Sequence, residues 1–154
     1  MSVRYNNSGL ENIIKGMKKN YAARVGILGD KNQRDETSLT NAEIGAIHEF
    51  GSLSRNIPKR SFIRLPLEVK LPEWIKKHGD DYFEFAEGGR LDLFYEGLGL
   101  DAEGMIAEAF ETSGFGTWAP DSPRTKKKYP TPDPKPLIDT SQLRNSISSE
   151  VVNV

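Results

Sequence analysis

The sequence predicts an α+β fold in a single domain, and three observations support this. Apolar residues recur at helical spacing in several separate stretches. Two short apolar runs, one after residue 21 and one at the C-terminal end, have the length of strands and are bounded by turn residues. The chain has 154 residues, which suffices for one buried core but is short for two.

Two elements are expected near the N-terminus. Ser8 and Glu11 have the spacing of a capping box, and a helix over 8–20 would place four apolar residues on one face: Leu10, Ile13, Ile14 and Met17. The run AARVGILG at 22–29 predicts a strand that ends in a turn. The polar residues at about 30–40 predict a flexible loop.

A second helix is expected over 41–50. Thr40 and Glu43 form another capping box, and Gly51 stands where a glycine commonly ends a helix. The prolines at 58, 66 and 72 then favour an extended arm, followed by a broken or late-starting helix, because proline removes a backbone donor.

The remaining chain predicts a long helix, a loop and a strand. Helical spacing extends over 74–113, with an interruption near the glycines of 96–104. Six of the nine prolines fall at about 114–136, which predicts a long extended loop with little regular structure. Asp139 or Thr140 would cap a short helical turn through Leu143, and 146–154 would form a strand at a sheet edge.

Charge is distributed unevenly along the chain. Residues 1–78 hold 14 basic and 8 acidic residues, 79–111 hold 1 and 10, and 112–154 hold 6 and 4. Two interpretations stay open. The acidic segment is either a solvated helix face, or one half of a contact between neighbouring copies with opposite fields.

The residues that commonly carry catalysis are scarce, so we expect no enzyme, no cofactor and no metal. The chain has no cysteine, and its two histidines, His48 and His78, lack a second ligand at a metal-binding spacing. A hidden hydrolase site would have to combine His78 with Asp80 and Asp81. No run of eighteen apolar residues occurs and the first twenty residues do not resemble a signal peptide, so we expect no membrane contact.

Three roles are open for the basic run RTKKKY at 124–129. It could bind nucleic acid phosphates, with Trp118 or Tyr129 stacking on bases. It could instead be a solvated loop, or match the acidic helix of a neighbour. The charged residues concerned are Arg124, Lys126, Lys127 and Lys128.

Four segments, in order, resemble a known family. They are AEIGAIHEFGS, IPKRSFI, GTWAPDSPRT and KPLIDTSQLRNSI, which span about residues 22–150 with their surroundings. They are similar to the tail-completion and neck proteins of tailed bacteriophages, a family that includes minor tail components and the Mu gpG-like virion morphogenesis proteins. The chain departs from the family pattern at Lys59, Ser61, Asp121 and Ser141, and the acidic segment 79–104 has no counterpart.

The resemblance implies a small antiparallel sheet with helices packed on one face, and a structural role in the virion. Such a tail terminator forms a ring, most often a hexamer, that ends the tail tube and presents the surface for head-tail joining. Its partners would be further copies of itself, the tail tube protein and the connector, with DNA passing through the ring. It would be assembled in the cytoplasm of the bacterial host and end in the tail or neck; a head-side connector is the alternative.

Ring formation needs contacts between subunits, and two kinds of anchor are candidates. Arginine side chains hold carboxylates in a fixed geometry, and buried aromatic or aliphatic side chains dominate interfaces. For each the alternative is a contact within its own subunit, such as an ion pair of Arg144 with Asp139. The full set of candidates is Arg60, Phe62, Ile63, Arg64, Trp118, Asp139, Leu143 and Arg144.

Overall fold

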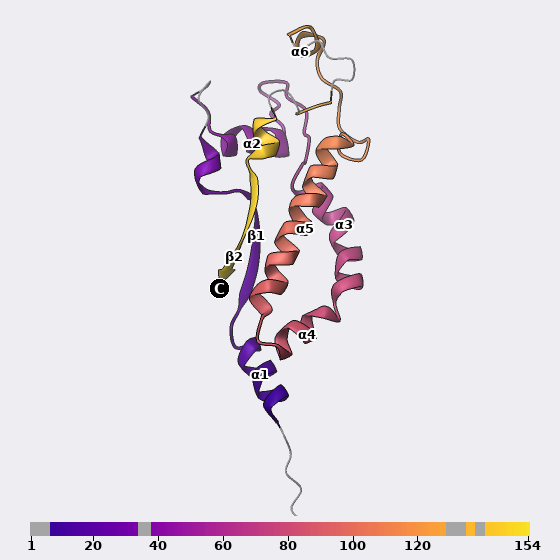
Figure 1. The fold of residues 1–154 in the computed structure, drawn as a ribbon. Helices are drawn as coiled ribbons and strands as arrows, with labels where there is room; N and C mark the ends of the chain where they lie inside the picture. Colours follow the sequence, from indigo (N-terminus) through magenta and orange to yellow (C-terminus); the bar gives the residue numbers. More distant parts are fainter. Residues whose placement is uncertain (1–6, 34–37, 129–134, 138–140) are drawn as a thin grey trace, which may run out of the picture.

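The computed structural model describes residues 7–33, 38–128, 135–137 and 141–154. Within them the chain forms helices and two strands in an elongated molecule (Figure 1). In chain order the elements are α1 (Ser8–Met17), β1 (Tyr21–Ile27), the 3-10 helix η1 (Gly29–Asn32), α2 (Asn41–Phe50), α3 (Arg64–His78), α4 (Asp81–Glu87), α5 (Leu91–Glu111), α6 (Pro123–Lys128), α7 (Gln142–Asn145) and β2 (Ile147–Asn153).

The two strands form an antiparallel sheet, and α5 packs along it (Figure 1). The register pairs Tyr21 with Asn153 at one end and Ile27 with Ile147 at the other. Helix α3 packs on α5, α1 and α4 lie together at one end, and α2 and α7 lie near the other. The predicted α+β class, with an antiparallel sheet covered on one face by helices, is confirmed.

The two faces of the sheet differ because side chains alternate along a strand. Ala23 and Ser149 face α5, where a side chain at Gly99 would come within 2.9 Å of the Ser149 Cβ. On the opposite face Arg24 and Glu150 pair across the strands at 3.6 Å and are exposed. The sheet therefore buries the face that lies against α5.

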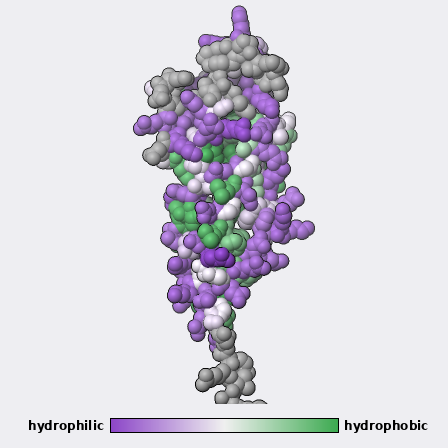
Figure 2. All heavy atoms as spheres, viewed as in Figure 1, coloured by the Kyte–Doolittle hydropathy of each residue, from purple (hydrophilic) through white to green (hydrophobic). Residues whose placement is uncertain are grey.

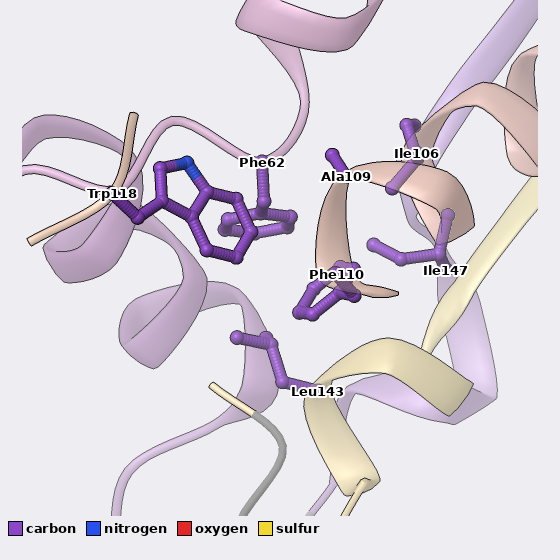
Figure 3. Packing of buried hydrophobic residues seen from close by; sticks show 7 residues of the cluster. All are labelled: Phe62, Ile106, Ala109, Phe110, Trp118, Leu143 and Ile147. Carbon is purple, nitrogen blue, oxygen red and sulfur yellow. The ribbon is translucent and has the colours of Figure 1, made fainter. Parts of the chain in front are cut away.

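One hydrophobic core joins α5 to the segments that follow α2 and precede β2 (Figure 3). The Phe62 and Phe110 ring centroids lie 5.3 Å apart, and Trp118 meets Phe110 edge-on at 5.8 Å. Burying each such side chain stabilises the fold by about 1.5–3 kcal/mol. The cluster consists of Phe62, Ile106, Ala109, Phe110, Trp118, Leu143 and Ile147.

Contacts of α3 with α5 also join the basic and the acidic segments inside one subunit. The Lys70 ammonium lies 2.8 Å from a Glu108 carboxylate oxygen. The indole of Trp74 donates to Asp101 at 2.6 Å, and its ring packs on Phe94. Part of the charge complementarity seen in the sequence is thus satisfied within the chain.

Helix α3 begins at Arg64, ten residues before the position that the prolines favour, so the extended arm is confined to 52–63. Pro66 lies in the first turn, where a backbone N–H would have no helical acceptor in any case. Pro72 lies inside the helix and removes one hydrogen bond without ending it. Packing against α5 compensates for that loss.

The predicted interruption near 96–104 is wrong, because α5 runs without a break from Leu91 to Glu111. The helical stretch breaks instead after His78 and at Gly88–Gly89, where Gly89 adopts a φ of +68°. Tertiary packing outweighs the glycine penalty of about 1 kcal/mol, and Gly99 is required for the close approach to β2.

Of the two predicted capping boxes, one is present in the structure and one is not. The Thr40–Glu43 capping box is present, with Thr40 N donating to Glu43 at 2.8 Å and Glu43 N donating to Thr40 at 3.2 Å. At α1 the capping position belongs to Asn7 rather than Ser8, and the Asn7 side chain makes no capping hydrogen bond. Of the loop expected at 30–40, residues up to Asn32 belong to η1, and 34–37 lie outside the described residues.

Candidate functional site

The four segments that resemble the phage proteins meet at one place. We call this place the junction and define it by Glu49, Arg60, Ser61, Trp118 and Asp121. Hydrogen bonds link the end of α2 to the arm, and the arm to the segment after α5. Leu143 of the last segment joins through the core (Figure 3). Residues far apart in the sequence thereby form a single rigid unit.

Glu49 is the centre of the junction. Its buried carboxylate accepts from the Ser61 hydroxyl at 2.5 Å and from backbone N–H groups at the start of α3: Phe62 at 2.8 Å, Ile63 at 3.0 Å and Arg64 at 3.3 Å. The first N–H groups of a helix lack helical acceptors and carry partial positive charge. A side chain of α2 therefore caps α3.

Arg60 fixes the segment after α5 to the arm. Its Nε donates to the Ala119 carbonyl at 2.9 Å and its Nη2 to the Pro120 carbonyl at 3.0 Å. Nη2 also lies 3.0 Å from an Asp121 carboxylate oxygen. Asp121, which departs from the family pattern, thus has a partner in this chain.

Trp118 follows a tight turn after α5, and its side chain contacts the same arm. Its indole donates to the Ser61 carbonyl at 3.3 Å. Gly114, in a left-handed conformation with φ +64°, lies against the ring, and a Cβ there would come 2.1 Å from the indole nitrogen. Only glycine fits at that position.

Two large apolar side chains are exposed beside the junction, among the charged Arg55, Lys59 and Arg64. After Gly51, with φ +76°, a short turn is closed by two hydrogen bonds of 2.9 Å between Ser52 and Ile57. Leu53 at this turn and Phe50 at the end of α2 are exposed. Hydrophobic residues form separate patches among hydrophilic ones on the face in Figure 2.

An open cavity of about 400 Å³ lies beside these residues. Its floor is Gly45, where a Cβ would come 2.8 Å from Ile27 and 3.3 Å from Phe62. The lining residues are Ile27, Ala42, Gly45, Ala46, Glu49, Phe50, Phe62, Ile63 and Arg64. The lining is mostly apolar, and its charged side chains are Glu49 and Arg64.

His48 is the one histidine near the junction. Burial, assisted by the nearby Arg60 charge and opposed by Asp121, lowers the pKa of His48 to about 4. Its Nδ1 is buried and, among the described residues, has no hydrogen-bond partner. The imidazole is neutral at pH 7.

The candidate anchors divide by burial. Arg60, Phe62, Trp118 and Leu143 are buried and make their contacts inside the subunit. Ile63 is half-buried, and Arg64 is exposed with only a 3.7 Å approach to Glu68. Arg144 pairs with Glu111 at 2.7 Å. Asp139 lies outside the described residues, so its ion pair with Arg144 stays a prediction.

The basic run is helical rather than a loop. Arg124, Lys126 and Lys127 are exposed on α6, which projects at one end of the molecule (Figure 1). The side chains of Lys128 and Tyr129 lie outside the described ones.

Sequence reasoning missed Glu49, Ser61 and Asp121. Glu49 gave no local signal, because its hydrogen-bond partners in the arm and at the start of α3 lie 12 to 15 positions further along the chain. No group of three acidic or histidine side chains among the described residues could hold a metal ion, and none of their helices is long and apolar enough to cross a membrane.

Comparisons of the chain with models of protein families, with curated proteins and with solved structures return no match.

Proposed function

We propose that this protein is a structural component of a phage virion that completes the tail tube and contributes to head-tail joining as a ring. The observation that carries the proposal is the junction. Three of the four segments on which the family resemblance depends are joined by hydrogen bonds of Glu49, Arg60 and Trp118, and the fourth packs on them through Leu143 in the core. A shared set of motifs that builds one rigid unit supports a shared architecture.

The surface beside the junction supports assembly rather than catalysis. The buried polar groups of the junction are used in hydrogen bonds within the chain, and the apolar Phe50, Leu53 and cavity over Gly45 are exposed beside the cations Arg55, Lys59 and Arg64. A rigid apolar surface loses little conformational entropy on binding. We assign this surface to the contact with the tail tube or the connector.

Electron microscopy of phage particles tests the proposal. Tails from cells infected by a phage that lacks this gene are compared with tails from cells that also express the protein. Overlong tubes or headless tails without the protein, and normal tails with it, are the expected result. Normal tails joined to heads in its absence would contradict the proposal.

Substitutions in the protein used for complementation test whether the apolar surface beside the junction makes this contact. Leu53→Asp places a charge on the exposed turn, and we expect it to fold and yet fail to restore normal tails. Val69→Asp is the matched control, because Val69 is also exposed but lies on α3. Equal complementation by both variants would exclude the turn from the contact.

A second candidate function, nucleic acid binding, is favoured by one observation only, the three exposed cations of α6. Contacts with phosphates release counterions, so affinity for DNA would fall steeply as salt rises. Fluorescence anisotropy with a DNA duplex at 50 and 200 mM salt measures this. We expect no salt-dependent binding beyond that of a Lys126→Ala, Lys127→Ala variant.

A further inference from the structure

Helix α5 carries a second apolar stripe, on the side that faces away from the core. Leu93, Gly97, Leu100, Gly104 and Ala107 follow one another at intervals of four and three residues. Leu93 is 44% exposed and Leu100 is 61% exposed. A Cβ at Gly97 or Gly104 would meet nothing within 4 Å. This spacing is typical of a helix that packs against another helix, and we call these five residues the outer seam.

The outer seam borders two open grooves between α5 and β2. One has a volume of about 340 Å³ and the other about 360 Å³, and both are lined by Leu100 and Glu103. Asp92 and Glu96 also line the second groove. No lysine or arginine occurs between positions 91 and 111. The seam therefore has an acidic rim, formed by Asp92, Glu96 and Glu103, and Arg144, which also lines the first groove, is paired with Glu111.

The acidic rim decides which kind of helix fits. Pairing of α5 with α5 of a second copy would bring like charges together at both rims, which disfavours that contact. A helix with exposed apolar residues and basic neighbours is required instead.

Helix α1 has this character. Leu10 is 58% exposed and Ile14 is 47% exposed, although both lie on the apolar stripe of the helix. Basic residues accompany them at Lys15, Lys18 and Lys19. The side of α1 that packs on α4 is a different one, where Gly16 lies close to Ala86 and Leu91. Helix α1 lies at one end of the molecule (Figure 1).

We propose that α1 of one copy docks on the outer seam of α5 of the next copy. The ten residues of α1 span about 15 Å, and Leu93 to Gly104 span about the same length. Ile14 lies against Leu100, and Leu10, about 6 Å away along α1, lies over Gly97 beside Leu93. Lys15 and Lys18 then lie level with Glu103 of the acidic rim.

The contact joins two different surfaces, so it is head-to-tail and repeats around a ring or along a filament. That the contact closes a ring rests on the proposed function, whereas the contact itself does not depend on it. One such contact buries less than a standard interface, so it is weak in isolation and gains strength from ring closure.

Disulfide cross-linking tests the contact, because the chain has no cysteine of its own. The variants Ile14→Cys and Leu100→Cys are prepared separately, mixed in equal amounts and oxidised at low salt. We expect a covalent heterodimer at several times the yield of the control mixture, Ile14→Cys with Leu53→Cys, in which Leu53 is exposed but lies at the junction. High salt should lower the first yield and leave the second unchanged.

Charge exchange supplies an independent readout. Lys15→Glu with Lys18→Glu in the Ile14→Cys chain should remove the cross-link, and Glu96→Lys with Glu103→Lys, on either side of Leu100, should restore it in the Leu100→Cys chain. Equal yields in the two mixtures, or a dominant disulfide-linked homodimer of the Leu100→Cys chain, would each overturn the proposal.

The two proposals fail differently. Rings observed by native mass spectrometry without the 14–100 cross-link would overturn this contact and leave the tail function standing. A salt-sensitive 14–100 cross-link in a protein whose removal leaves normal tails would overturn the tail function and leave the contact standing.

Discussion

Arg60 and Asp121 form an ion pair in which the closest nitrogen and oxygen lie 3.0 Å apart and only 7% and 15% of the two side chains remain exposed. Removing one partner of such a pair leaves a buried charge without compensation. We expect Asp121→Leu to lower the free energy of unfolding by about 3 kcal/mol.

The double variant Arg60→Met, Asp121→Leu should recover part of that loss, because neither charge of the pair then remains buried, while the Ala119 and Pro120 carbonyls lose the donor that Arg60 supplied. Urea denaturation of the four proteins of the cycle measures the coupling. Additive effects of the two substitutions would show that the pair is not coupled.

The cap that Glu49 provides for α3 should be one of the most sensitive positions in the chain. Glu49→Gln keeps the shape but replaces one acceptor oxygen by a donor that faces N–H groups. We expect a loss of about 2–3 kcal/mol in the free energy of unfolding. The exposed Glu73→Gln is the matched control and should change stability by less than about 0.5 kcal/mol. Equal losses would mean that the cap contributes nothing.

The neutral His48 should make the fold sensitive to acid. The pKa of His48 is about 4 in the folded state, against an ordinary value of 6.5, so below pH 6.5 the unfolded state binds a proton that the folded state does not. Stability should be flat above pH 6.5 and fall by up to about 3 kcal/mol towards pH 4.

Chemical denaturation at a series of pH values measures this slope. His48→Gln should flatten it, whereas His78→Gln, which removes the other histidine, should keep it. The lowered pKa of Glu43, caused by its hydrogen bonds with Thr40, adds a loss only below about pH 4.5.

Ser141 is a position where glycine should stabilise the protein. It precedes α7 with a φ of +56°, in the left-handed region that costs a residue with a side chain about 1–2 kcal/mol. Ser141→Gly removes this strain but adds freedom to the unfolded chain, so we expect a gain of up to about 1 kcal/mol. Ser141→Ala keeps the strain and should bring no gain. A melting temperature that rises equally in both variants would contradict this account.

Two glycines of α5 form a matched pair. Gly97→Ala should stabilise the isolated subunit by up to about 1 kcal/mol, since the new methyl group meets nothing within 4 Å. Gly99→Ala should destabilise it by about 1–3 kcal/mol, because the methyl group would collide with Ser149. Thermal unfolding at low protein concentration distinguishes the two. The opposite order would mean that α5 does not lie on β2 as described.

The helices and strands with complete local signals are predictable from the sequence. The capping box at Thr40 and the glycine at 51 mark both ends of α2, and the two strands lie within a residue or two of their expected positions. The start of α3 is not predictable in this way. The rule that proline ends helices holds for helix interiors, whereas Pro66 occupies a first turn and Pro72 is tolerated because α3 packs on α5.

The junction is predictable only in part. Sequence patterns identify the arm and Trp118, but the partner of Glu49 is a helix end 12 or more residues away, and the partner of Arg60 is Asp121. Ser141 adopts a positive φ, although a serine at this position does not predict one, because glycine is the residue that tolerates this conformation best. Such pairings depend on the folded path of the chain, which local patterns do not specify.

The pairing of β1 with β2 has a consequence for folding kinetics. Residues 28–146 lie between the two strands, so closing the sheet costs a chain entropy of about 4 kcal/mol before any strand contact forms. The α3–α5 pair, in contrast, is close in sequence and can form early. We expect φ-values near zero along both strands and a folding rate limited by this long-range closure rather than by the helices that make up most of the subunit.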